Sequence, residues 1–119
     1  VLGDGLWTLY QVLAWSLVGI IGSSLAEKFR DGDSLSISRI GLAAFAAGFV
    51  FDWVVSISAL HSIPMEKFPV YIMVGLPFDL AHAAGNLAFA AWLTGPLSEI
   101  MTRHSSQREA VVEPVKVTY

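Results

Sequence analysis

The stretch "GLPFDLAHAAGNLAFAAWLTGPL", from Gly75 to Leu97, decides the fold predicted for this chain. Alanine, leucine and phenylalanine dominate it, which suits the interior of a lipid bilayer. It also carries Asp79, His82 and Asn86, whose side chains are unfavourable in hydrocarbon unless they face a partner helix or a water-filled cavity. Their spacings of three and four residues place all three on one face of a helix. We therefore expect a transmembrane helix with a polar face turned inward.

The composition of the whole chain extends this interpretation to an integral membrane protein. Hydrophobic residues make up 55% of the 119 residues and charged residues only 14%, whereas an ordinary soluble domain has about a quarter charged residues. The net charge is -3 without a basic run, so we expect no nucleic-acid partner. Cysteine is absent, which excludes disulfides, thiolate metal ligands and thiol catalysis.

Three long apolar blocks predict an all-α membrane domain over residues 1–103. The expected transmembrane helices cover about residues 6–26, 37–60 and 77–101. The third apolar block begins earlier, at Phe68, and is too long for one straight crossing. Because Pro77 has no backbone N–H and disfavours helix in the preceding residue, we expect a break there. Residues 68–76 are then a short interfacial helical piece.

The polar segments predict the topology. Ser34 or Ser36 is the expected cap of the second helix, and residues 104–119 read as a polar, flexible tail. Lys and Arg concentrate in the first loop and in the tail, whereas the second loop has only Lys67. Three crossings place the first loop and the tail on the same side, which should be cytoplasmic. We expect a multi-pass protein of a prokaryotic plasma membrane.

Polar and aromatic side chains within the apolar blocks predict a cavity that binds a small molecule. Aromatic faces would stack against a planar ligand and polar groups would fix its orientation. The expected lining residues are Trp7, Gln11, Trp15, Asp52, Trp53, Asp79, His82 and Asn86. Among these we expect Asp52, Trp15 and His82 to face the ligand.

Each of these residues also has a structural interpretation. Trp7 fits an interfacial anchor, and Asp79 fits a first-turn acid that complements a helix N-terminus. His82 and Asn86 fit hydrogen bonds between helices. The small residues of "GLAAFAAG" (Gly41–Gly48) and "AHAAGNLAFAA" (Ala81–Ala91) favour close packing within the bundle, with docking of another membrane subunit as the alternative.

Catalytic signatures are weak in this sequence. It has no serine elbow, HExxH motif or phosphate-binding glycine loop. His61, His82 and His104 lack the spacing of a metal site. We therefore expect neither an enzyme nor a metal or cofactor.

Two segments resemble the substrate-specific (S) components of energy-coupling-factor (ECF) transporters, notably the actinobacterial type. The first segment resembles the last transmembrane helix of that family, and its matching residues are Gly75, Leu76, Pro77, Phe78, Asp79, His82, Ala83, Gly85, Asn86, Gly95, Pro96 and Leu97. The second is "GDGLWTLYQVLAWSLVGIIGSSLA", which matches a family pattern at Gly3, Gly5, Trp7, Thr8, Gln11, Ala14, Trp15 and Gly19. Leu6 stands where that pattern usually has proline. The likeness spans most of residues 3–103.

The resemblance implies a binding component of an ABC-type importer for a vitamin or similar micronutrient. Such a component contacts a transmembrane coupling protein and two ATPase subunits and reorients in the bilayer to release its solute. Family members have about six helices, so we expect this chain to correspond to helices 4–6, either as a fragment or as a shortened relative. Two other hypotheses stay open: a small structural or assembly subunit of a larger membrane complex, and a proton or cation pathway through Asp52, Asp79 and His82.

Overall fold

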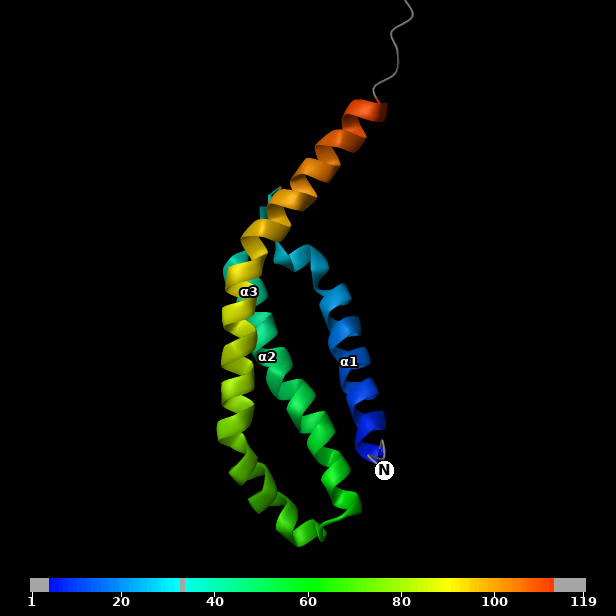
Figure 1. Ribbon diagram of the computed structural model, residues 1–119, viewed down its shortest axis with the longest axis vertical. Helices are drawn as coiled ribbons and strands as arrows, with labels where there is room; N and C mark the ends of the chain where they lie inside the picture. The colour runs from blue at the N-terminus through cyan, green and yellow to red at the C-terminus, as the bar shows by residue number, and fades with distance from the viewer. Residues whose placement is uncertain (1–4, 33, 113–119) are drawn as a thin grey trace, which may run out of the picture.

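Three helices run alternately up and down along the molecule (Figure 1). The computed structural model describes residues 5–32 and 34–112. Helix α1 covers Leu6–Ser24, α2 covers Ile37–Ser56 and α3 covers Phe68–Val112. Within these described ranges, three helical segments are long and apolar enough to cross a membrane. This confirms the helical class and the number of spans that the apolar blocks predict.

The connection between α1 and α2 contains a small ladder that the sequence does not signal. A short 3-10 helix, η1 (Ala26–Phe29), leads into β1 (Arg30–Asp31), which pairs antiparallel with β2 (Ser34–Leu35). Gly32 lies in the turn with a φ of 61°, a conformation that glycine adopts without a Cβ clash. Two paired residues on each side are too few to show an alternating pattern.

Arg39 and Ser98 hold this connection against the helices. The Nη1 group of Arg39 donates hydrogen bonds to the carbonyls of Lys28 at 3.2 Å and Arg30 at 2.9 Å. The Leu35 N–H donates to Oγ of Ser98 on α3 at 3.1 Å. The first loop and the C-terminal part of α3 therefore lie at the same end of the bundle, as expected for three crossings.

Helix α2 begins at one of its two predicted caps. Ser36 is the N-cap residue, but its side chain makes no capping hydrogen bond. Its Oγ lies 3.4 Å from Oγ of Ser38 instead. After Ser56 the chain continues as a 3-10 helix, η2 (Ile57–His61), and a short turn, η3 (Met65–Lys67), precedes α3. The predicted helix over 37–60 thus corresponds to α2 plus η2.

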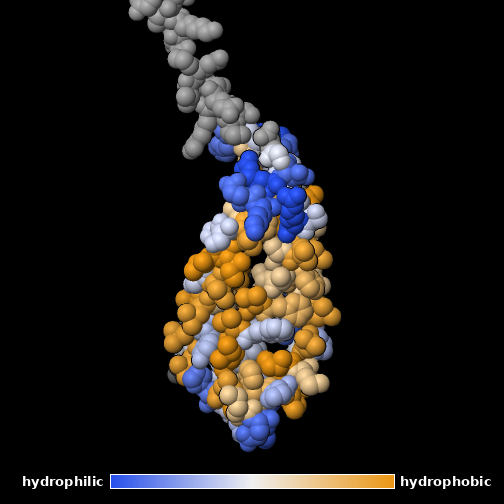
Figure 2. Space-filling view, turned by 180° about the vertical axis from the view of Figure 1, so that it is seen from behind, coloured by the Kyte–Doolittle hydropathy of each residue, from blue (hydrophilic) through white to orange (hydrophobic). Residues whose placement is uncertain are grey.

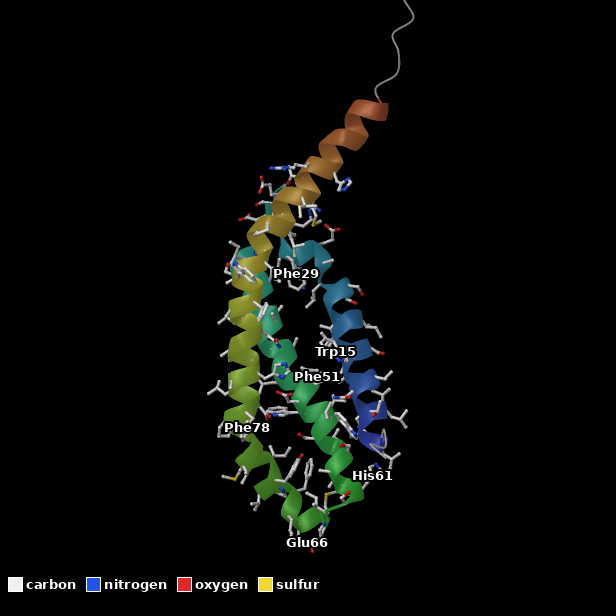
Figure 3. All side chains as sticks on the ribbon, viewed as in Figure 1. Trp15, Phe29, Phe51, His61, Glu66 and Phe78 are labelled. Atoms are coloured by element: carbon white, nitrogen blue, oxygen red, sulfur yellow. The ribbon has the colours of Figure 1, made fainter. Side chains whose placement is uncertain are left out.

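The predicted break at Pro77 is wrong. Helix α3 begins at Phe68 and continues through both Pro77 and Pro96, so residues 68–76 are not a separate interfacial piece. An interior proline removes one hydrogen bond and bends the helix, and such bends are common in membrane helices. Helix α3 changes direction close to Phe78 (Figure 3). Pro77 therefore bends the helix without ending it.

The C-terminal boundary of α3 also differs from the prediction. The helix reaches Val112 instead of ending near residue 101, so the first part of the predicted tail is helical. Glu, Arg, Ala and Met are good helix formers, and Glu99 pairs with Arg103 one turn later. The remaining tail residues, 113–119, lie outside the described part. At about 1.5 Å per residue, the 45 residues of α3 exceed a hydrocarbon core of about 30 Å.

Large apolar side chains cover the outside of the bundle (Figure 2). Phe78, Met73 and Trp92 are 78%, 73% and 71% exposed, while among the residues whose burial is described the buried hydrophobic ones are Ala14 and Ala83. Water would oppose so much apolar surface, whereas lipid tails solvate it well. Hydrophilic residues gather at the end where the first loop meets α3. This distribution fits a bundle that lies in a bilayer with its loops at the surface.

Candidate functional site

Close packing of α2 against α3 positions the polar residues of the site. A Cβ atom placed on Gly48 would lie 2.9 Å from the Cα of Ala83 and 3.1 Å from the amide nitrogen of Asn86. Such distances leave no room for any side chain but hydrogen. Gly48 and Ala83 therefore pack within the bundle, as predicted for small residues of these segments, whereas Ala81, Ala84, Gly85, Ala88 and Ala91 are exposed. Asp52 lies one helical turn after Gly48, and His82 directly precedes Ala83.

Asp52 and His82 face each other across this contact. Both carboxylate oxygens of Asp52 lie 2.9 Å from Nδ1 of His82. Because an ionised carboxylate only accepts hydrogen bonds, Nδ1 carries the proton and donates it. The side chains are 20% and 41% exposed, respectively. The contact fixes the orientation of the imidazole ring and leaves Nε2 for another partner.

A second polar contact crosses the same pair of helices. The indole Nε1–H of Trp53 donates to Oδ2 of Asp79 at 3.2 Å. Asp79 is only 8% exposed, whereas Trp53 is 51% exposed. The ring of Trp53 also packs edge-on against Phe49, with centroids 5.9 Å apart. Because α3 begins at Phe68 and has no acidic residue in its first turn, Asp79 is not the first-turn acid suggested by the sequence, and its structural role is instead to hold α2 to α3.

A cavity of about 280 Å³ lies where all three helices meet. Trp15 of α1 and Phe51 of α2 face each other across the gap between their helices (Figure 3), with ring centroids 5.0 Å apart. The Phe51 ring in turn stands nearly perpendicular to the His82 ring at 5.9 Å. The wall is aromatic and aliphatic apart from His82 and Asn86. Its residues are Trp15, Val18, Ala44, Ala47, Phe51, His82, Asn86, Phe89, Ala90 and Leu93.

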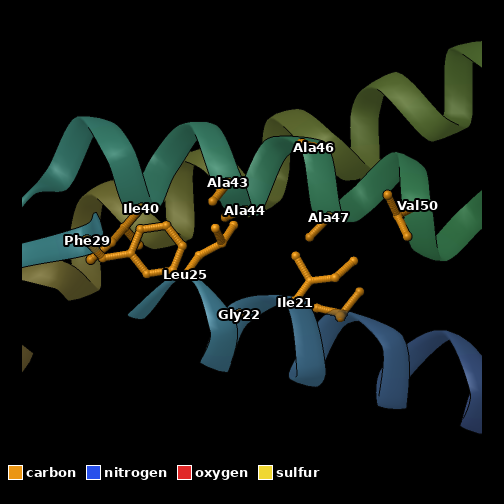
Figure 4. A pocket seen from close by; sticks show the side chains of 11 residues that line it. Ile21, Gly22, Leu25, Phe29, Ile40, Ala43, Ala44, Ala46, Ala47 and Val50 are labelled. Carbon is orange, nitrogen blue, oxygen red and sulfur yellow. The ribbon is translucent and has the colours of Figure 1, made fainter. Parts of the chain in front are cut away.

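An apolar cavity of about 300 Å³ adjoins the first along the contact between α1 and α2 (Figure 4). It extends toward the first loop, where Leu25 and Phe29 line it. Val18, Ala44 and Ala47 line both cavities. Alanine side chains on α2 leave this space between the helices. The second cavity offers no polar side chain to a ligand.

The structure brings together some of the residues predicted to line one cavity. Trp15, His82 and Asn86 line the smaller cavity, and Asp52 reaches it through its contact with His82. The remaining four predicted residues, Trp7, Gln11, Trp53 and Asp79, are outside the lining of both cavities. Trp7 is 49% exposed, a position that suits an interfacial anchor.

Sequence reasoning missed several residues of the site. Phe51 separates Trp15 from His82, and its spacing of four and seven residues from Ala47 and Ala44 places it on the same face of α2. That spacing was the available signal.

The hydroxyl of Tyr10 lies 2.9 Å from Nε2 of His61, with ring centroids 5.8 Å apart, and links α1 to η2. The sequence carries no signal for this second contact, because 51 residues separate its partners.

Comparisons with models of protein families, with curated proteins and with solved structures gave no match. Function is therefore inferred from the cavity, from the polar pairs beside it and from the two sequence segments that meet there. The arrangement suits noncovalent binding. Aromatic faces are available for stacking, and His82 and Asn86 are available for hydrogen bonds.

Proposed function

We propose that this protein is the membrane-embedded binding component of an ECF-type importer for a vitamin or similar micronutrient. One observation carries the proposal: the two segments that resemble this family meet at one cavity. Trp15 comes from the first segment, and His82 and Asn86 come from the second. The cavity thus joins the Trp15 ring of one signature to the polar side chains of His82 and Asn86 from the other.

The size and chemistry of the cavity support a small solute. Its volume of about 280 Å³ is near the lower end of ligand pockets, at about 300 Å³. An apolar cavity of about 150 Å³ can hold benzene, so this one has room for one or two rings. Aromatic walls with a few polar groups are typical of sites that orient a planar ligand.

In this function the chain binds the solute, and ATPases supply the energy. A transmembrane coupling protein and two ATPase subunits are the proposed partners, in a prokaryotic plasma membrane with the C-terminus in the cytoplasm. The exposed apolar surface supports a membrane location. The Lys and Arg residues near the first loop and the end of α3 support the orientation.

The test is purification of the tagged full-length gene product from its native membrane in mild detergent, with the partners identified by mass. We expect two related ATPases and one membrane coupling protein. Recovery of the chain alone would contradict the importer function. Recovery with an unrelated membrane complex would favour the assembly-subunit alternative.

A pair of tryptophan variants connects the cavity to transport. Trp15→Ala removes an aromatic wall of the cavity, whereas Trp92→Ala removes an outward-facing ring that is 71% exposed. Both variants should retain the partners. Uptake of the solute by cells should fall about fivefold for Trp15→Ala, since an aromatic contact contributes about 1 kcal/mol. Equal uptake by the two variants would argue against this cavity as the binding site.

A proton or cation pathway is the second candidate, favoured by the 2.9 Å contact between Asp52 and His82. Intramembrane carboxylates and histidines often carry protons. The neighbouring polar pair does not extend such a pathway, because indole only donates hydrogen bonds. An Asp52→Asn variant separates the two functions. A changed pH dependence of flux with unchanged solute affinity would support the pathway and oppose the importer.

A further inference from the structure

We propose that the solute is a planar cation of one or two rings that donates an N–H hydrogen bond to Nε2 of His82. This inference rests on the proposed function and specifies its substrate class. Three observations carry it: the charge of the membrane-spanning segments, the Asp52–His82 contact and the aromatic wall of the cavity.

The spanning segments carry an excess of negative charge. α1 has no charged side chain, α2 has Arg39 and Asp52, and α3 up to Leu97 has Asp79 and His82. Arg39 lies in the first turn of α2 and donates to loop carbonyls. With a neutral His82 imidazole, the two carboxylates give a net charge of -2 near the cavity. Weak dielectric screening makes this charge unfavourable to an anion and favourable to a cation.

The Asp52–His82 contact determines what the imidazole offers to the cavity. Both carboxylate oxygens approach Nδ1, so this nitrogen holds a proton. Neutral imidazole carries one proton, which leaves Nε2 as an acceptor. His82 lines the cavity, and Asp52 is a positioning residue because it acts through His82. A solute with N–H groups can therefore donate a hydrogen bond to Nε2 of His82, while the Asp52 carboxylate accepts the hydrogen bond from Nδ1.

The remaining wall favours a flat cation over a flexible or anionic solute. Trp15, Phe51 and Phe89 line the cavity, and the faces of aromatic rings attract cations. The volume of about 280 Å³ is less than twice that of an apolar cavity that holds benzene. A solute of one or two rings therefore fits this cavity.

The test uses three probes with one ring and nearly the same shape: benzamidinium, benzamide and benzoate. Their planar substituents are cationic, neutral and anionic, respectively. Each is titrated by calorimetry into the purified full chain in phospholipid nanodiscs. We expect benzamidinium to bind at least about tenfold more tightly than benzamide, the size expected for a hydrogen bond that involves a charged group. Benzoate should produce no binding heat.

Two variants remove the same unit of charge at different places. Asp52→Asn should weaken benzamidinium binding at least about tenfold and benzamide binding by less, because only the cation also loses the attraction of the carboxylate charge. Glu99→Gln is the control, because Glu99 is exposed and pairs with Arg103 near the end of the span. It should change neither affinity. An equal loss in both variants would show that overall charge, rather than the Asp52–His82 pair, selects the cation.

Other outcomes overturn the inference. Binding of benzoate or benzamide as tight as that of benzamidinium would do so, and so would the absence of binding by all three probes. The purification of partners is a separate measurement. If the ATPases and coupling protein are recovered but benzamidinium does not bind, only the substrate class fails. If benzamidinium binds but no such partners are recovered, the cation site stands and the importer function fails.

Discussion

Helix α2 contacts one neighbour through glycines and the other through alanines and aromatic rings. Against α3, Gly41 and Gly48 are buried, and a Cβ on Gly48 would lie 2.9 Å from the backbone of Ala83. Against α1, Ala44 and Ala47 line cavities of about 280 and 300 Å³, and Phe51 lines the smaller of the two. Adjacent residues of one helix therefore face a close contact on one side and open space on the other.

The close contact of α2 with α3 and the open contact of α2 with α1 have different structural consequences. The close contact fixes the relative positions of Asp52 and His82, which lie on different helices. The open contact leaves the space in which a solute would lie. Among the described residues, the Trp15–Phe51 rings and the Tyr10–His61 contact link α1 to the rest. Packing then resists separation of α2 from α3 more than separation of α1 from either.

Gly48→Val should produce the largest effect on stability. The first added carbon atom would already lie 2.9 Å from the Cα of Ala83, so α2 and α3 must separate. Overpacking of this kind costs about 1–3 kcal/mol. Thermal unfolding of the purified protein in detergent should show a lower midpoint, and the Asp52–His82 contact should weaken because the helices move apart.

Gly85→Val provides the matched control on α3. A Cβ atom on Gly85 would have nothing within 4 Å, so the same substitution meets open space. Its unfolding midpoint should stay near that of the unchanged protein. Equal destabilisation by the two variants would mean that the glycine effect comes from helix propensity rather than from the contact between α2 and α3.

The sequence predicts the close contact of α2 with α3 and the three spans, but it does not predict the course of α3 at Pro77. Small residues at Gly41–Gly48 and Ala81–Ala91 predict the close contact, because only small side chains let helices approach. Composition predicts the three spans, since their length and hydropathy are local properties. Hydropathy does not separate a helix that ends at Pro77 from one that bends there. That outcome depends on tertiary packing and on the lack of competing water.

The candidate site is predicted only in part for a related reason. Helical spacing places Asp79, His82 and Asn86 on one face, but only His82 and Asn86 reach the cavity. Rotation of α3 against α2 decides which of these residues meets α1, and that rotation follows from contacts such as Gly48 with Ala83. Phe51 was missed because it carries no polar group. Its role depends on the ring of Trp15 on another helix.

The Asp52–His82 pair should show a coupling of about 1 kcal/mol in a double-mutant cycle. Hydrogen bonds between membrane helices average about 0.6 kcal/mol and reach about 1.7, and a hydrogen bond from Nδ1 to a carboxylate with both oxygens nearby belongs in the upper half. The cycle uses Asp52→Ala, His82→Ala and the double variant, with unfolding measured in detergent. Additive effects would show that the close contact holds the two residues without energetic gain from the pair.

Trp53→Phe should have a smaller effect. It removes the indole N–H that donates to Asp79 at 3.2 Å and keeps an aromatic ring near Phe49. We expect a loss of about 0.6 kcal/mol, the average for a hydrogen bond between membrane helices. Asp79→Asn retains an acceptor oxygen and should be milder. A larger loss from Trp53→Phe than from Gly48→Val would contradict the dominance of the glycine contact.

Ala47→Val should have the smallest effect on stability and gives the sharpest comparison with its neighbour. Ala47 lines both cavities, so two more methyl groups enter open space. In a bilayer the added carbons gain packing contacts rather than removal from water, while β-branching lowers helix propensity by several tenths of a kcal/mol. The net change in unfolding free energy should be favourable or within about 0.5 kcal/mol of zero.

The valine side chain at position 47 should nonetheless weaken benzamidinium binding, measured by the same calorimetry, because it fills part of the cavity. If Ala47→Val destabilised the protein as much as Gly48→Val, the two sides of α2 would be equally tight and the cavities would not be available to a solute.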